Sequence, residues 1–96
     1  MVVEFLTFQV EDDLRAEWME ADERTWSRYL AQRPGFLSKQ LWVERDHPGE
    51  VHAVIVWSDW ESWQKVPHEE IATLDEEMGG LFRRCTVRIY DVVRDH

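Results

Sequence analysis

Val2-Val3-Glu4-Phe5-Leu6-Thr7-Phe8-Gln9-Val10 is apolar on both faces when it is read as a β-strand. Successive side chains of a strand point to opposite faces, so Val3, Phe5 and Thr7 share one side, and Val2, Leu6, Phe8 and Val10 share the other. Residues 51–57, VHAVIVW, show the same two-sided pattern. A strand with one face in water alternates apolar and polar residues. We therefore expect a sheet with both faces covered, one by helices and one by a second copy of the same sheet.

The length and charge of the chain limit its class. Its 96 residues predict a single domain that spans residues 1–96. The formal net charge is −9, with 20 acidic residues against 11 Lys and Arg. Nucleic acids and anionic membranes are bound mainly through clustered Lys and Arg, so we expect neither of them as a partner.

Cysteine use and the first residues favour a cytoplasmic protein. Cys85 is the only cysteine, which excludes a disulfide within the chain and suits a reducing compartment. The amino-terminal residues carry no basic leader and are interrupted by Glu4, unlike a signal peptide. No apolar run reaches the roughly 18 residues that a membrane-spanning helix needs.

Strands and helices can be placed along the whole sequence. We expect strands over residues 2–10, 36–45, 51–57 and 83–93, with a turn over 46–49. The first helix begins at Glu11 and ends before Pro34, and its core stripe at helical spacing consists of Leu14, Trp18, Ala21, Thr25 and Tyr29. Ser58 is the predicted N-cap of the next helix, with Glu61 completing a capping box, and Pro67 begins a further helical segment.

The order β-α-β-β-α-β is the ferredoxin-like α+β arrangement, a four-stranded antiparallel sheet with both helices on one face. Because the strands are two-sided, we expect the sheets of two chains to pack together as a homodimer, in a dimeric α+β barrel. We place Phe8 and Val56 on the packed face, and we expect a glutamate at either position to yield a monomer or an aggregate.

A set of residues spread over most of the chain forms a family pattern. It consists of Asp22 and Trp26 at a spacing of four, Pro34-Gly35-Phe36, Lys39, Trp42, Pro48, Glu50-Val51, Val54-Ile55, Trp57, Glu61, Trp63, Lys65 and Pro67. In these residues the chain resembles the dimeric α+β barrel superfamily, which includes antibiotic-biosynthesis-monooxygenase-like and haem-degrading proteins. It is most similar to a family of equally short members whose function is not established. The resemblance implies one pocket per subunit, between sheet and helices, for a small organic molecule or haem.

The resemblance carries over only part of the superfamily's chemistry. Its cofactor-free monooxygenases and haem-degrading members commonly use a pocket asparagine together with a tryptophan and a histidine or another polar residue, whereas this chain has no asparagine. Trp63 and His68 are available, but their spacing differs from that of haem-degrading members. We therefore expect no cofactor, with haem as a disfavoured alternative.

Asp22 and His68 are the candidate catalytic residues. Asp22 lies between the core stripe and a second apolar stripe on the first helix, which predicts a partly buried carboxylate with a raised pKa that could act as a base. The alternative is a structural Asp at the flank of the helix that is paired with an arginine or a backbone N–H across the dimer. His68 follows Pro67 and could be a general acid or base or a haem ligand, although a solvated residue in the first helical turn is the simpler interpretation.

The remaining candidates are assigned to the ligand pocket. Trp26 and Trp63 lie off the simplest core stripe, and Trp42 could complete an aromatic box around a flat ligand, although core packing explains most tryptophans equally well. Lys39 could neutralise a ligand carboxylate, but a salt bridge to an acid of the first helix is the favoured alternative. His52 could point into the pocket or serve as a hydrogen-bonded interface histidine. We predict no metal site, because the histidines show no pairing at ligand spacing.

Three functions are compatible with these features. The first is a small-molecule-binding or monooxygenase-like protein, with an aromatic or hydrophobic ligand in one pocket per subunit. The second is a non-catalytic dimeric module whose tryptophans only fill its core and interface. The third, binding of a protein partner through the acidic surface of the first helix, would leave the pocket filled. An open cavity beside Asp22 or Trp63 would favour the first, and dense packing there the second.

Overall fold

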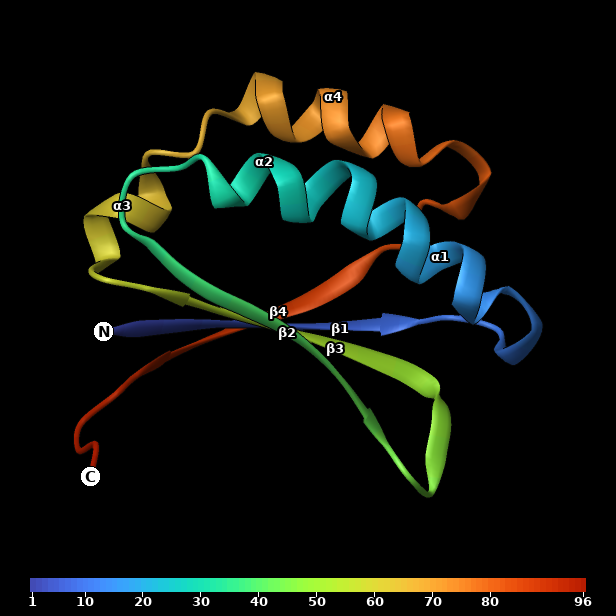
Figure 1. Ribbon diagram of the computed structural model, residues 1–96, viewed down its shortest axis with the longest axis horizontal. Coiled ribbons are helices and arrows are strands. Elements are labelled where there is room, and N and C mark those ends of the chain that lie inside the picture. The colour runs from blue at the N-terminus through green and yellow to red at the C-terminus, as the bar shows by residue number, and fades with distance from the viewer.

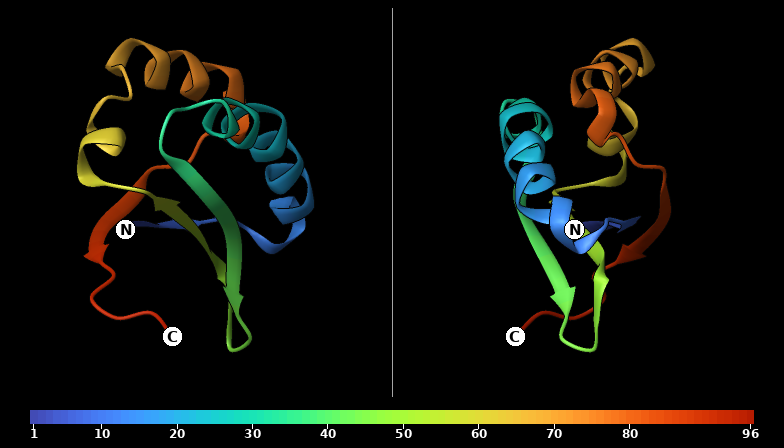
Figure 2. Two further views of the ribbon diagram at one scale, coloured as in Figure 1. Left: turned by 60° about the vertical axis from the view of Figure 1, so that its left-hand side comes forward. Right: turned by 90° about the vertical axis from the view of Figure 1, so that its right-hand side faces the viewer.

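The computed structural model describes residues 1–96 and has the ferredoxin-like order that the sequence predicts. Its strands are β1 (Val2–Gln9), β2 (Phe36–Glu44), β3 (His47–Trp57) and β4 (Cys85–Asp91). They form one antiparallel sheet in the order β2-β3-β1-β4. All helices lie on one face of this sheet and leave the other face bare (Figure 1, Figure 2). None of the helices is long and apolar enough to cross a lipid bilayer.

The first helical region contains a π-helical turn in its middle. It runs through η1 (Asp12–Leu14), α1 (Arg15–Asp22), the π turn η2 (Glu23–Ser27) and α2 (Arg28–Ala31). A π turn holds more residues than an α turn. The residues that face the sheet after the π turn are therefore displaced along the sequence from those that regular α-helical spacing predicts. Leu30 is therefore buried, whereas Tyr29, which we expected in the core stripe, is only half-buried.

The second helical region consists of α3 (Trp60–Gln64), α4 (His68–Met78) and η3 (Gly79–Leu81). The N-cap of α3 is Asp59 and not Ser58 as predicted, because the carboxylate of Asp59 accepts the Ser62 backbone N–H at 2.7 Å. That hydrogen bond also holds the pKa of Asp59 below its ordinary value.

Asp59→Ala is expected to lower the Tm by a few degrees, because it leaves an amide of the first turn of α3 without its acceptor. Ser58→Ala removes only a 3.3 Å contact between neighbouring side chains and is expected to leave the Tm nearly unchanged. Thermal unfolding of both variants checks this, and equal effects would contradict the assignment of the cap.

The β2–β3 hairpin is tighter than predicted. Its turn is Arg45-Asp46, and β3 begins at His47, so Pro48 and Gly49 belong to the strand and not to the turn. The pairing of β1 with β3 ends at Gln9–Glu50, so Pro48 lies where β3 has outrun β1. A proline destabilises a strand little at a position where no neighbouring strand would accept a hydrogen bond from the backbone N–H that proline lacks.

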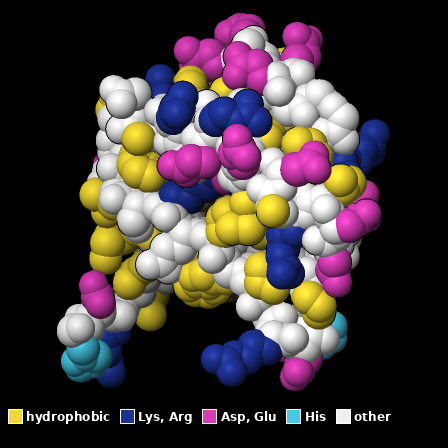
Figure 3. Space-filling model, turned by 45° about the vertical axis from the view of Figure 1, so that its right-hand side comes forward, with side chains coloured by type: hydrophobic (Ala, Val, Ile, Leu, Met, Phe, Trp, Pro, Cys, Tyr) yellow, Lys and Arg dark blue, Asp and Glu magenta, His cyan; other side chains and the backbone are white.

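The strand register decides which side chains face the helices. Leu6 pairs with Ala53 on one side and with Val87 on the other, and all three face the helices. Phe8 shares this side and packs against Trp18 with ring centroids 4.9 Å apart, so its placement on the outer face was wrong. Val56 lies on the opposite, outer side. Figure 3 shows acidic side chains at the top of the molecule and hydrophobic side chains gathered below them.

The core lies between the inner face of the sheet and the helices, in two adjoining clusters. The first contains Val10, Trp18, Ala21, Val51 and Met78. The second contains Leu30, Ala53, Ile55 and Trp57. Both clusters lie toward β1 and β3, which leaves the space beside β4 for the site.

Candidate functional site

A cavity of about 760 Å³ lies between the sheet and the helices. Leu6, Ala53 and Ile55 line it from the strands. It opens on the β4 side, where the lining residues Phe82 and Val87 are 41% and 51% exposed. A purely structural module would fill this region with side chains, and here it is open.

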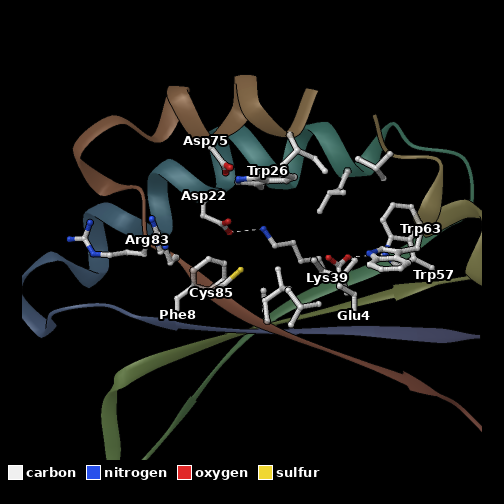
Figure 4. A pocket seen from close by; sticks show the side chains of 18 of the residues that line it. Glu4, Phe8, Asp22, Trp26, Lys39, Trp57, Trp63, Asp75, Arg83 and Cys85 are labelled. Atoms are coloured by element: carbon white, nitrogen blue, oxygen red, sulfur yellow. Dashed lines mark hydrogen bonds and ion pairs between the residues drawn. The ribbon is translucent and has the colours of Figure 1, made fainter. Parts of the chain in front are cut away.

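A buried ion pair lies in the middle of the cavity lining. The ammonium group of Lys39, on β2, donates to Asp22 Oδ2 at 2.6 Å and to Ser27 Oγ at 2.8 Å (Figure 4). The side chains of Lys39 and Asp22 are 7% and 6% exposed. The π turn produces this arrangement, since it follows Asp22 directly, ends at Ser27, and brings both toward β2. The salt bridge to the first helix, which was the favoured alternative for Lys39, is therefore present.

The ionisation of Asp22 reflects its burial. Removal from water disfavours the charged form and raises the pKa of the Asp22 carboxyl, and the charge of Lys39 offsets only part of this effect. A carboxylate with a raised pKa beside a fixed cation can accept a proton from a neighbouring acidic group at moderate pH.

Tryptophans from separate elements approach the same cavity. Trp26 comes from the π turn, Trp63 from α3 and Trp57 from β3. The side chain of Trp57 is fully buried and its Nε1 donates to Glu4 Oε1 at 3.1 Å. His68 also lines the cavity, but it is an exposed residue at the start of α4. The structure thus brings Asp22, Trp26, Lys39, Trp63 and His68 to one cavity.

Trp42 and His52 do not line the cavity, and their assignment to it was wrong. They pair with each other across β2 and β3 at a position whose side chains point to the outer face of the sheet. His52 stacks on Phe5 with ring centroids 5.0 Å apart and shares a 2.9 Å hydrogen bond with the Thr7 hydroxyl. Trp42 meets Phe5 edge-on and is 49% exposed.

Among the lining residues that were not predicted from the sequence are two acids and a thiol. Glu4, Asp75 and Cys85 all reach the cavity, and burial raises the pKa of each. Glu4 could have been found, because it is the one acid on the side of its strand that otherwise carries Val2, Leu6, Phe8 and Val10. The raised pKa of the Cys85 thiol disfavours the reactive thiolate.

The lining residues fit a haem group poorly. Haem iron is bound by side chains such as imidazole, thiolate or phenolate. His68 is exposed at the rim, and the thiol of Cys85 resists ionisation. The interior carboxyl of Glu4, which has no cationic partner, would be pressed against an apolar macrocycle. No group of His, Cys, Asp and Glu in the structure is arranged to hold a metal ion.

Comparison with known proteins identifies the fold. No family model and no curated protein matches the sequence. The structure is similar to the haem-degrading protein MhuD from Mycobacterium tuberculosis, solved with two haems bound (TM-score 0.81, 19% identity, 100% of this chain and 99% of that one). It is also similar to a variant of the cofactor-independent oxygenase SnoaB from Streptomyces nogalater (0.75, 21%, 98% and 94%). A third similar structure is a candidate antibiotic biosynthesis monooxygenase from Deinococcus radiodurans (0.78, 12%, 100% and 96%). The chain has the fold of antibiotic-biosynthesis-monooxygenase-like proteins.

Proposed function

We propose that this chain, with its antibiotic-biosynthesis-monooxygenase-like fold, binds a small, largely apolar molecule in the cavity and oxidises it without a cofactor. The observation that carries the proposal is the buried Asp22–Lys39 pair at the wall of a solvent-connected cavity. A buried ion pair stabilises a fold no better than apolar side chains of the same volume. Its position beside Trp26 is therefore better explained by a bound molecule than by stability.

The roles of the pair follow from its chemistry. Asp22 accepts a proton from an acidic C–H or O–H group of the bound molecule, and Lys39 lies beside the anion that forms. An electron-rich anion of this kind can transfer electrons directly to molecular oxygen, which is the oxidant of the reaction. Conversion of one methylene to a carbonyl consumes one O₂ and releases one water, so atoms and electrons balance. Apolar walls keep the anion away from bulk water.

Binding can be tested before the natural ligand is known. Native mass spectrometry of the protein purified without dialysis and without oxygen is expected to show an added small mass, and 2-naphthylmethanol is expected to bind at one equivalent per chain. Ile71→Trp should weaken that binding at least tenfold, because Ile71 lines the cavity from α4. The neighbouring Ala72 is exposed, so Ala72→Trp is the matched control. Absence of both the added mass and probe binding would refute the proposal.

Catalysis is tested on the molecule that is carried through purification. On admission of air, its mass is expected to rise by one oxygen less two hydrogens in the wild type and to stay unchanged in Asp22→Asn. Asparagine preserves the shape of the side chain and a carbonyl acceptor for Lys39, so the molecule should still be bound. Oxidation at the same rate in Asp22→Asn would exclude Asp22 as the base.

The outer face of the sheet supports assembly as a homodimer. Trp42 and Tyr90 are each 49% exposed there, on either side of an apolar centre that contains Val54 and Val56. Val56→Glu is expected to convert the dimer to monomer at micromolar concentration, because a charge would be buried without a partner. Light scattering coupled to size exclusion measures this, with Ala72→Glu on the exposed side of α4 as the control. A Val56→Glu protein that remains dimeric would place the interface elsewhere.

A further inference from the structure

We infer that Glu4, together with the indoles of Trp57 and Trp63, forms a subsite that receives a positively charged amine of the ligand. This inference rests on the proposed function, because it concerns one end of the same cavity. It adds the chemical class of the bound molecule, namely a flat apolar body with an ammonium group at one end.

Glu4 occupies an unusual position for an acid. It lies on the central strand β1, between Ile55 of β3 and Ile89 of β4, and it faces the helices. Trp57 Nε1 donates to its Oε1, and the side chain of Trp63 also favours its charged form (Figure 4). No charged group of the chain donates to Glu4, which leaves its carboxylate without a cation at the cavity wall.

None of the cations that line the cavity forms an ion pair with Glu4. The ammonium group of Lys39 is bound by Asp22 and Ser27; its charge lowers the pKa of Glu4, but it makes no hydrogen bond or ion pair with that carboxylate. The guanidinium of Arg83 is bound by Glu11 at 2.9 Å and 3.1 Å. Arg84 is exposed and makes no ion pair. Glu4 is thus an interior acid whose neighbouring donors are the neutral indoles of Trp57 and Trp63.

The chemistry of this end favours a cation over other ligand groups. An ammonium group would give the carboxylate of Glu4 a charge-assisted hydrogen bond, which is about twice as strong as one from a neutral hydroxyl. Indole rings also tolerate a nearby cation, because their faces are electronegative. A ligand carboxylate would instead meet a like charge. The amine would sit at the α3 end, and the part of the ligand that reacts would lie toward Asp22.

Three probes of one shape and different charge test this. Calorimetry at neutral pH would compare 2-naphthylmethylamine, which is cationic, with 2-naphthylmethanol and 2-naphthoate. For the wild type, we expect the amine to bind at least tenfold more tightly than the alcohol and the acid to bind most weakly. Glu4→Gln should reduce the preference for the amine to less than threefold, while the affinity for the alcohol changes little. Glu17→Gln removes the same charge from an exposed site on α1 and should keep the preference.

The outcomes separate this inference from the proposed function. Equal binding of amine and alcohol to the wild type would overturn the amine subsite and leave the small-molecule site intact. A preference for the amine that persists in Glu4→Gln would also overturn it, because the cation would then be recognised by other groups. Binding of none of the three probes would overturn the amine subsite, and together with the absence of an added mass in the purified protein it would refute the small-molecule site as well. The wild-type comparison needs no variant, so it decides the question even if Glu4→Gln does not fold.

Discussion

Replacing Gly35 with alanine is expected to lower the free energy of unfolding by about 2–5 kcal/mol. Gly35 has a φ of +84°, a backbone conformation that is energetically unfavourable for any residue with a Cβ atom. A Cβ added there would lie 2.2 Å from Ser62 Oγ and 2.4 Å from Ser62 Cβ. The backbone of Gly35 also accepts the Ser58 N–H at 2.8 Å, so the start of β2 is held against α3 and cannot move away.

Two other glycines separate the cost of conformation from the cost of the clash. Gly79 has a φ of +56° but open space around its Cα, so Gly79→Ala should cost only about 1–3 kcal/mol. Gly80 has neither a positive φ nor a close neighbour, and its replacement should change stability by less than about 1 kcal/mol. Denaturant unfolding of the three variants gives the order. A Gly35→Ala protein as stable as Gly80→Ala would mean that α3 is not packed on Gly35.

The fold could be predicted from the sequence because its signals are local. Apolar residues on both sides of residues 2–10 and 51–57 predicted strands with both faces covered, and the helical spacing and turn residues supplied the order of elements. Errors arose where two local signals compete. Pro48 and Gly49 are typical of a turn, yet they extend a strand beyond its neighbour. The π turn η2 cannot be detected by a fixed helical angle, so the prediction buried Tyr29 instead of Leu30.

The site was harder to predict because it depends on which face of the sheet meets the helices. Tryptophan and histidine are typical of ligand pockets, but the strand register places the side chains of Trp42 and His52 on the outer face of the sheet. Lys39, on the same strand as Trp42, points inward because it lies an odd number of residues away. Asp75 and Cys85 reach the cavity only through the packing of α4 and β4, which no spacing in the sequence reveals.

Lys39→Met is expected to lower the free energy of unfolding by about 3 kcal/mol at neutral pH. The substitution preserves most of the side-chain volume but leaves the carboxylate of Asp22 buried without its cation. Removal of one partner of a buried ion pair is strongly destabilising, because the remaining charge is desolvated and has no compensating partner. Lys65→Met, which removes an exposed lysine of the same chain, serves as the control for the loss of positive charge.

The loss in Lys39→Met should depend on pH in a defined direction. Burial already raises the pKa of Asp22 above its ordinary value of 3.8, and loss of Lys39 removes the charge that offsets this effect. Between the unfolded and the folded pKa, the folded protein holds a proton that the unfolded chain has released, so raising the pH favours unfolding. The variant should therefore approach the stability of the wild type as the pH falls toward 3.8. A difference that stays constant with pH would show that Asp22 does not carry the penalty.

Removing both charges separates stability from function. Asp22→Asn combined with Lys39→Met leaves no buried charge in this part of the cavity lining, so most of the stability lost in Lys39→Met should return. Oxidation of the bound molecule should not return, because both the base and its cation are gone. A double variant that is as stable as the wild type and inactive would mean that the pair is retained for chemistry. A double variant less stable than Lys39→Met would mean that the pair holds β2 to the π turn, and the proposal for Asp22 would lose its main support.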